Sequence, residues 1–344
     1  MADHRSETFE YPQGTTIPVD QDLSEFEDEA YSSEIASYAT SLSSSVTSYN
    51  WQHGRRYHNY KEGSYKFPND EREQDRLDLF HSMFKLLLGN RLFLAPIRDK
   101  EEPLRVLDIG TGTGIWAIEF ADEFPLAEEA SLSFLIVGND LSPIQPRWVP
   151  PNVIFEIDDV EAEWPNRPPF DFIHSRYMCG SVQDWPRLFE QAYSQTKPGG
   201  WVEFQDFHLV NYSEDGTLRE GNNVNRFYEL LREACDKVNR PVTVGKELGK
   251  WAEEAGFVNV VHAKFQLPLG IWPREKRMKE IGALNMLQFL EGLEAFSTAT
   301  FTNILGWEIE EVQAFLALVR RDAKDSKVHM MHDLHVVYGQ KPLD

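Results

Sequence analysis

The sequence predicts an α/β fold in which a seven-stranded, mostly parallel sheet is covered by helices on both faces. Short apolar runs alternate with helical patterns beyond residue 104, and a glycine-rich turn joins the first run to a helix. This alternation is typical of parallel sheets, because each pair of parallel strands needs a crossover connection. The strands are expected at Arg105–Ile109, Phe134–Gly138, Val153–Ile157, Phe170–His174, Trp201–Asp206, Val258–Phe265 and Leu334–Tyr338.

The helices are predicted before, between and after these strands. Apolar residues recur at three- and four-residue spacing up to Leu88, which predicts an amphipathic helix that begins at Asn69 or Asp70. Its apolar face consists of Leu77, Phe80, Phe84 and Leu87. The other helices are expected at Ile115–Phe124, Pro186–Thr196, Asn223–Val238, Gly245–Ala255 and Ile309–Asp322.

Three regions are expected along the chain. Residues 1–50 hold ten acidic residues against one basic residue and are rich in serine. They can bury too little apolar surface to offset the entropy of ordering, so we predict a disordered tail. Residues 51–103 are predicted to form an N-terminal arm and helical lid. Residues 104–344 form the α/β domain, with a helical insertion at about 267–305 that can cap a pocket.

Composition excludes several classes of protein. The formal net charge of -22 opposes nonspecific binding to nucleic acid or to anionic membranes, since both are polyanions. Cys179 and Cys235 are too few for a disulfide framework or a cysteine-based zinc site, and no metal site is expected. No apolar run approaches the roughly 20 residues that span a bilayer. We therefore expect a cytoplasmic protein, with the nucleus as the alternative.

The glycine loop after the first strand predicts a ligand that contains a nucleoside. Its spacing is Gly110-x-Gly112-x-Gly114, which lets the backbone lie against a ligand at a helix N-terminus. A dinucleotide-binding loop needs its last glycine where this chain has Ile115. Asp108 suits the amino group of an amino-acid ligand and would repel a pyrophosphate. These features favour S-adenosylmethionine and oppose a nicotinamide-dependent oxidoreductase.

Acidic residues also follow the second and third strands. Asp140 ends the second strand, where a carboxylate can accept hydrogen bonds from both ribose hydroxyls of a nucleoside. Asp158, Asp159 and Val160 follow the third strand. They can place a carboxylate near the adenine amino group and a backbone N–H near the ring. An ordinary surface turn is the alternative, and neither aspartate is preferred.

Five stretches of the sequence resemble one family. They are Leu107–Phe120, Asp140–Pro146, Asp158–Trp164, Phe170–Gly180 and Lys197–Asp206, and together they resemble the fungal class I methyltransferases of the LaeA-like group. The resemblance implies a Rossmann-like fold with a seven-stranded sheet, S-adenosylmethionine as the methyl donor, and a place in secondary metabolism. Members include small-molecule methyltransferases and a nuclear regulator that works with velvet proteins. Thr111 and Thr113 stand where the regulator-like pattern often has a cysteine, which weakens transfer of the regulatory role.

The candidate donor and acceptor residues follow from these motifs. The predicted donor site comprises Asp108, Gly110, Thr111, Gly112, Gly114, Asp140, Leu141, Asp158, Asp159, Val160 and His174. Packing is the alternative role for His174. Two loops, His174–Met178 and Asp206–His208, are expected to form the acceptor wall. His208 is the candidate base and Asp206 the residue that orients it, although a histidine after a strand is commonly structural.

Two functions are therefore expected. The first is methylation of an oxygen or nitrogen atom of a small molecule in fungal secondary metabolism. The second is a LaeA-type regulator of secondary-metabolite gene clusters that acts in a protein complex. In that case the N-terminal tail or the outer helices would contact the protein partner.

Overall fold

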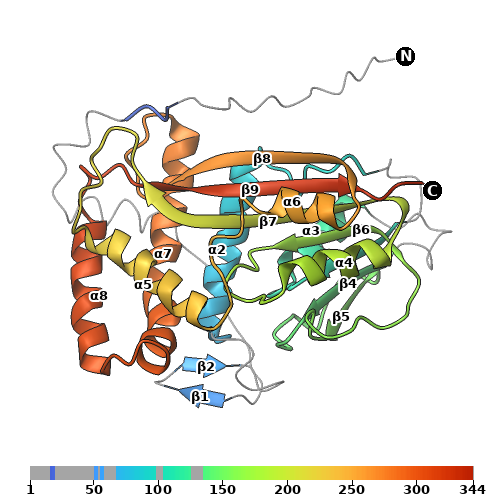
Figure 1. Ribbon diagram of the computed structural model, residues 1–344, viewed down its shortest axis with the longest axis horizontal. Helices are drawn as coiled ribbons and strands as arrows, with labels where there is room; N and C mark the ends of the chain where they lie inside the picture. Colours follow the sequence, from blue (N-terminus) through green and yellow to red (C-terminus); the bar gives the residue numbers. More distant parts are fainter. Residues whose placement is uncertain are drawn as a thin grey trace.

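The computed structural model describes residues 16–19, 50–52, 55–57, 67–97, 104–124 and 135–343. Its centre is a seven-stranded sheet with the order β5-β4-β3-β6-β7-β9-β8 (Figure 1). Strand β9 runs antiparallel to both β7 and β8, and the other pairs are parallel. The strands are β3 (Arg105–Ile109), β4 (Leu135–Asp140), β5 (Val153–Ile157), β6 (Phe170–Arg176), β7 (Thr196–Tyr212), β8 (Val258–Pro268) and β9 (Met331–Gln340). The predicted mostly parallel, seven-stranded sheet is confirmed.

Five strands, β4, β6, β7, β8 and β9, are longer than the sequence predicts, and the difference is largest in β7 and β9. β7 and β9 pair from Trp201 opposite Gln340 to Tyr212 opposite Met331, so their hydrogen-bonded ladder extends past the apolar run at each end. β7 also begins at Thr196, which the sequence predicts as the last residue of a helix. As a result His208 lies within β7 rather than in a loop after it.

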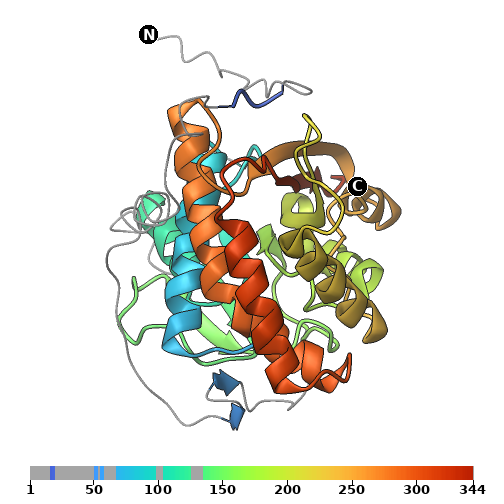
Figure 2. The ribbon, with the colours of Figure 1, turned by 90° about the vertical axis from the view of Figure 1, so that its left-hand side faces the viewer.

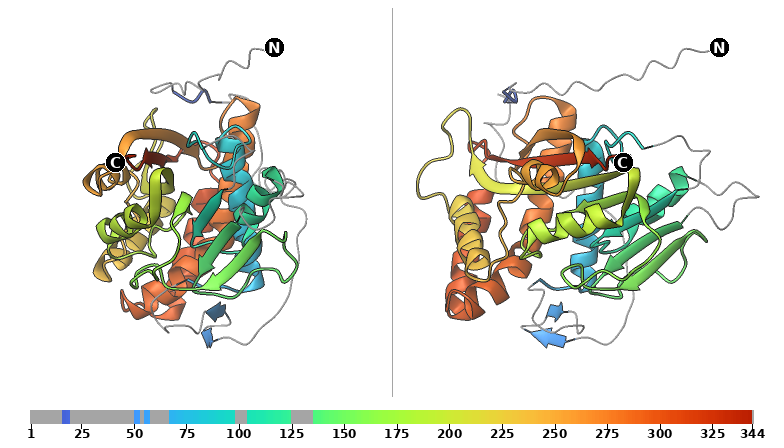
Figure 3. Two further views of the ribbon diagram at one scale, coloured as in Figure 1. Left: turned by 90° about the vertical axis from the view of Figure 1, so that its right-hand side faces the viewer. Right: turned by 45° about the vertical axis from the view of Figure 1, so that its right-hand side comes forward.

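Helices cover both faces of the sheet (Figure 3). On one face, strand residues such as Val106 and Phe172 pack against Trp116 and Phe120 of α3. On the other face, residues such as Ile173 and Phe204 belong to a core that includes α4 and α6. The helices are α2 (Glu71–Leu87), α3 (Ile115–Glu123), α4 (Trp185–Gln195), α5 (Asn223–Lys237), α6 (Leu248–Glu254), α7 (Lys276–Asn303) and α8 (Ile309–Ala323).

The predicted insertion at 267–305 consists mainly of α7, a helix of 28 residues. It packs along α2, with α8 beside it (Figure 2). Polar contacts join the two helices: Arg72 Nε is 2.7 Å from Glu291 Oε2, and Arg76 Nη1 donates to Gln288 Oε1 at 3.2 Å. The insertion is therefore part of the main core.

Two short N-terminal segments lie outside the main sheet. Within the predicted tail, Val19 forms a β-bridge with Pro273, just before α7. Apart from residues 16–19 and Asn50, the tail lies outside the described residues. Strands β1 (Asn50–Gln52) and β2 (Arg55–Tyr57) form a separate antiparallel pair. None of the helices in the described part of the chain has both the length and the apolar character of a membrane span.

Candidate functional site

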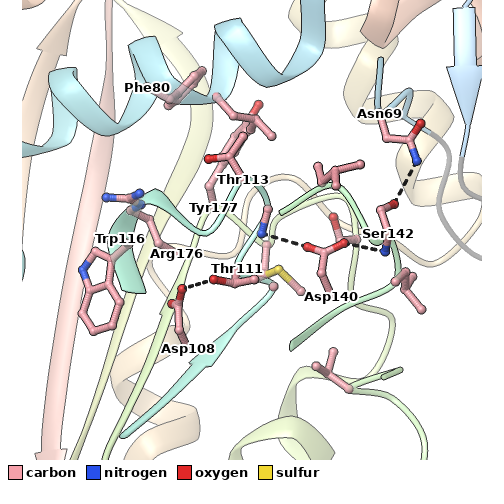
Figure 4. Close-up of a pocket in the computed structure, with 18 of the residues that line it drawn as sticks. Asn69, Phe80, Asp108, Thr111, Thr113, Trp116, Asp140, Ser142, Arg176 and Tyr177 are labelled. Carbon is pink, nitrogen blue, oxygen red and sulfur yellow. Dashed lines mark hydrogen bonds between the residues drawn. The ribbon is translucent and has the colours of Figure 1, made fainter. Parts of the chain in front are cut away.

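A cavity of about 1200 Å³ lies at the carboxyl ends of β3, β4 and β6 (Figure 4). Helix α2 covers it through Leu77, Phe80 and Phe84, the apolar face that the sequence predicts. Ligands of doubly wound sheets bind at this edge of the sheet. Nine of the predicted donor residues line the cavity: Asp108, Gly110, Thr111, Gly112, Asp140, Leu141, Asp158, Asp159 and Val160.

The glycine loop has a backbone that other residues adopt only under strain. Gly110, Gly112 and Gly114 have φ angles of 65°, 58° and 79°, all in the left-handed region. A Cβ atom on Gly110 would collide with Met178 Sδ, and one on Gly114 would collide with the ring of Phe155. The predicted donor residue Gly114 is the N-cap of α3 and is not among the residues that line the cavity. Its role in this geometry is to shape the loop.

Asp140 fastens the glycine loop to the end of β4. Its Oδ2 accepts the N–H of Gly112 at 2.9 Å, and its Oδ1 accepts the N–H of Ser142 at 2.9 Å. Burial raises the pKa of Asp140 to about 6, and the nearby Asp108 carboxyl adds to the rise. The carboxyl group thus sits on the cavity wall with a fixed orientation, as a ribose-binding group requires.

Asp108 is held from two sides. Its Oδ2 accepts the hydroxyl of Thr111 at 2.6 Å, and its Oδ1 is 2.7 Å from His174 Nδ1. The His174 ring stacks on Trp116 with the centroids 3.8 Å apart. His174 is fully buried and is not among the residues that line the cavity, although it was predicted as a donor residue. It acts on the cavity through Asp108 and Trp116, which both line it.

Asp158 and Asp159 form a turn that also faces the cavity. Asp158 Oδ1 accepts the N–H of Asp159 at 2.9 Å, and Asp159 Oδ1 accepts the N–H of Glu161 at 2.9 Å. The N–H of Asp158 donates to the carbonyl of Asp140 at 3.1 Å, which ties the turn to β4. The sequence leaves two roles open for these residues, a contact with the ligand or an ordinary surface turn. The two roles are compatible, because this turn also lines the cavity.

The predicted pair of Asp206 and His208 has no support in this geometry. Asp206 is buried and accepts the backbone N–H groups of Met178, Cys179 and Phe207 at 2.7, 2.9 and 2.8 Å. Burial raises its pKa to about 6. His208 Nδ1 is 3.0 Å from the carbonyl of Thr243, and among the described residues no hydrogen bond joins Asp206 to His208. Asp206 therefore anchors the loop after β6 instead of orienting a base.

The other predicted acceptor wall does face the cavity. Arg176, Tyr177 and Met178 line it. The Arg176 guanidinium lies 5.0 Å from the Phe84 ring centroid, and its Nη2 is 3.0 Å from His81 Nδ1. Burial lowers the pKa of Arg176 to about 10. Tyr177 has a φ of 59°, a strained conformation for a side chain of this size.

Asn69 and Ser142 also line the cavity, and the sequence did not single them out as ligand contacts. Asn69 Nδ2 donates to Ser142 Oγ at 3.1 Å and so bridges the start of α2 to the loop after β4. Arg55 forms an ion pair with Asp70, the N-cap of α2. Arg55 and the neighbouring Arg56 are both buried beside the start of α2. Residues 51–69 are rich in aromatic and basic residues, and this composition is the only sign of the contact in the sequence.

Comparisons with known proteins identify a family and several relatives. The methyltransferase domain family matches residues 79–262. Methyltransferase pytC of Aspergillus terreus is 48% identical over 326 residues, which cover 95% of this chain and 96% of pytC. The secondary metabolism regulator laeA of Aspergillus fumigatus is 36% identical over 296 residues, 85% of this chain and 76% of laeA. Probable methyltransferase tdiE of Emericella nidulans is 38% identical over 279 residues, 80% of this chain and 85% of tdiE.

Among solved structures, phosphoethanolamine N-methyltransferase 2 of Haemonchus contortus is similar with a TM-score of 0.43 and 20% identity. The match covers 78% of this chain and 57% of that chain.

The sheet, the glycine loop and the cavity at the carboxyl edge define a class I methyltransferase. The chain belongs to the methyltransferase domain family and, within it, to the LaeA-like fungal methyltransferases. It is an S-adenosylmethionine-dependent methyltransferase.

Proposed function

We propose that the protein methylates an oxygen or nitrogen atom of a small molecule of fungal secondary metabolism, with its methyl donor held in the cavity at the ends of β3, β4 and β6. The observation that carries the proposal is the fixed carboxyl group of Asp140 beside the glycine loop, on the wall of that cavity. The similarity to pytC over nearly the whole chain supports an enzymatic role.

The residues of the cavity fit the parts of S-adenosylmethionine. Asp108 would bind the amino group of its methionine portion, and Asp140 would accept the ribose hydroxyls. Asp158 or Asp159 would contact the adenine amino group, with the N–H of Val160 near the ring. Close approach to Gly110 and Gly112 is open because neither residue has a side chain. When bound, the donor supplies a sulfonium methyl group for in-line displacement, so the protein mainly positions the acceptor and excludes water.

Calorimetry tests the donor assignment directly. We expect the protein to bind S-adenosylhomocysteine and not NAD. Asp140→Ala should weaken binding by about tenfold or more, because one charge-assisted contact to a hydroxyl contributes roughly 1.5–3 kcal/mol. An unchanged affinity in folded Asp140→Ala would remove this residue from the site.

Labelled donor tests the acceptor class. Incubation with the extract of a strain that lacks the gene should label one metabolite, and wild-type extract should show that metabolite already methylated. Absence of transfer to any small molecule, together with normal S-adenosylhomocysteine binding, would contradict the biosynthetic role.

The similarity to laeA supports a second candidate function, regulation of secondary-metabolite gene clusters in a protein complex. The acidic tail or an outer helix such as α8 would then contact the partner, and the protein would act in the nucleus. Deletion of the gene would change the transcripts of several clusters. A change confined to one methyl group on one metabolite would favour the enzyme, which acts in the cytoplasm.

A further inference from the structure

A second cavity of about 570 Å³ adjoins the donor cavity. Phe80, Tyr177 and Ser181 line both spaces, so the two cavities meet at these side chains. The remaining lining residues of the second cavity are Phe67, Arg76, Cys179, Phe207, Leu209, Tyr228, Leu231, Val242, Gln288, Phe296 and His332. We call this space the aromatic chamber.

The walls of the aromatic chamber suit a flat apolar ring. Phe80 stacks on Tyr177 with ring centroids 4.5 Å apart, and Tyr177 meets Phe207 edge-on at 5.5 Å. Phe67 likewise meets Phe296 edge-on at 5.4 Å on α7. Aromatic rings in such pairs leave faces and edges that attract a further ring. An aromatic guest therefore gains more here than an aliphatic one of equal size.

The one cation that lines the aromatic chamber is neutralised within the described structure. Arg76 is buried, and its guanidinium forms an ion pair with Glu73 at 2.5 Å and donates to Gln288 at 3.2 Å. It also lies 4.8 Å from the Phe296 ring centroid. A guest with its own charge would have to be desolvated without a new counter-ion, which is costly. The chamber thus favours an uncharged molecule.

His332 is a buried polar residue of the aromatic chamber. It is only 2% exposed, and its Nδ1 has no hydrogen-bond partner among the described residues. Its ring packs edge-on against Phe207 and lies 5.8 Å from the ring of Tyr228. Burial lowers the pKa of His332 to about 4, so the imidazole is neutral near pH 7. A buried, unpaired imidazole nitrogen costs free energy unless a ligand supplies the missing hydrogen bond.

We propose that the aromatic chamber is the acceptor site, that it takes a neutral, flat aromatic molecule, and that a hydroxyl group on this molecule forms a hydrogen bond with His332. This inference rests on the proposed function, since it assigns the acceptor to a space beside the donor cavity. A hydroxyl group can donate or accept, so it satisfies His332 in either imidazole tautomer. His332 thereby fixes which edge of the guest faces Phe80, Tyr177 and Ser181, where the methyl group must arrive.

The test uses 2-naphthol and naphthalene, two probes that differ by one hydroxyl group. Their binding to the full-length protein saturated with S-adenosylhomocysteine is measured by fluorescence titration. We expect 2-naphthol to bind about tenfold more tightly than naphthalene, because one hydrogen bond to an otherwise unpaired buried group is gained. If 2-naphthol does not bind, or binds no better than naphthalene, the proposal is wrong.

Three variants locate the probe. His332→Phe keeps a ring in place but removes both nitrogens, so it should erase the preference for 2-naphthol. Leu231→Trp places an indole in the chamber and should reduce the affinity for both probes at least tenfold. His329→Phe changes a histidine that pairs with Asp215 and lines neither cavity, so both affinities should be unchanged. Wild-type affinity of 2-naphthol in Leu231→Trp would overturn the chamber as its binding site.

Two further measurements distinguish a failure of the donor site from a failure of the aromatic chamber. Binding of S-adenosylhomocysteine tests the donor site by itself, so its loss would count against the proposed function and not against the aromatic chamber. His332→Phe should also raise the midpoint of thermal unfolding, because it removes a buried polar group without a partner. A lower midpoint would show that His332 has a structural role, which contradicts a group held ready for a ligand. If His332→Phe fails to fold, that outcome also contradicts the assignment.

Discussion

Oδ1 of Asp108 lies 2.7 Å from Nδ1 of His174, and this contact joins β3 to β6 directly behind the donor cavity. Burial lowers the pKa of His174, so the neutral ring donates its Nδ1–H to the carboxyl group. The stack of His174 on Trp116 fixes the plane of the ring. The carboxyl group that would bind the donor's amino group is therefore oriented by a residue outside the cavity.

His174→Phe tests this orientation. Phenylalanine keeps the stack on Trp116 but leaves Asp108 without one hydrogen bond, so the free energy of unfolding should fall by about 1–3 kcal/mol. The affinity for S-adenosylhomocysteine should fall about tenfold, as measured by calorimetry. His174→Asn retains an N–H donor and should recover part of that affinity. Equal donor binding in the wild type and in His174→Phe would show that Asp108 needs no such support.

Donor binding should also depend on pH through Asp140. The pKa of this group is raised to about 6 in the free protein, and ribose hydroxyl groups donate best to the ionised form. Affinity for S-adenosylhomocysteine should therefore be full above pH 7 and fall about tenfold by pH 5, where about one-tenth of Asp140 is ionised. Asp140→Asn should bind more weakly at pH 7.5 and lose most of this pH dependence. Calorimetry at four pH values measures how the affinity of each protein changes with pH. The same pH dependence in wild type and Asp140→Asn would refute the role of Asp140 in donor binding.

Gly110 and Gly112 provide a matched pair of substitutions. Both have a positive φ, so alanine costs about 1–2 kcal/mol of strain at either position. At Gly110 the new Cβ would also displace Met178, which lines the cavity, whereas at Gly112 it would meet only Leu77 Cδ1 at 3.5 Å. Gly110→Ala should therefore weaken donor binding at least tenfold more than Gly112→Ala.

The double variant Gly110→Ala with Met178→Ala gives the control. Removal of the Met178 side chain makes room for the new Cβ and should restore part of the donor affinity. If the double variant binds no better than Gly110→Ala alone, backbone strain and not occlusion explains the loss.

Local patterns made much of this architecture predictable. The spacing of Gly110, Gly112 and Gly114 and the place of Asp140 after a strand depend on neighbouring residues, so the sequence alone indicates the loop and its ligand class. The same holds for the amphipathic helix α2, which was predicted to start at Asn69 or Asp70. Asp70 is the N-cap and accepts the N–H of Glu73 at 3.0 Å.

Contacts between distant parts of the chain were not predictable. His208 was chosen because an apolar run ends near Asp206, but pairing with β9 extends β7 to Tyr212 and keeps His208 inside the strand. The aromatic chamber depends on the packing of α7 against α2, which brings Phe296 beside Phe67. No short sequence motif indicates that packing, so the sequence alone could not identify His332 as a residue of the aromatic chamber.

The burial of Glu203 makes the stability of the protein depend on pH. It is fully buried in β7, and its Oε2 accepts the N–H groups of Leu94 and Ala95 at 2.7 and 2.6 Å. Burial raises its pKa from 4.5 to about 7. The folded state therefore binds this proton more tightly than the unfolded state, and the resulting stabilisation is complete below pH 4.5 and lost as the pH rises through about 7.

Glu203→Gln removes this titration while it keeps a carbonyl oxygen for the N–H groups of Leu94 and Ala95. The substitution also disturbs the hydrogen bond from Gln205 Nε2 to Glu203 Oε1. This effect is present at every pH, so it changes the free energy of unfolding of the variant relative to wild type by a constant amount. Between pH 4.5 and pH 8 the free energy of unfolding of the variant should gain up to about 3 kcal/mol relative to wild type. Urea unfolding at a series of pH values measures this difference, with Glu190→Gln on the exposed face of α4 as the control. A difference that does not vary with pH would mean that Glu203 has the same proton affinity in the folded and unfolded chains.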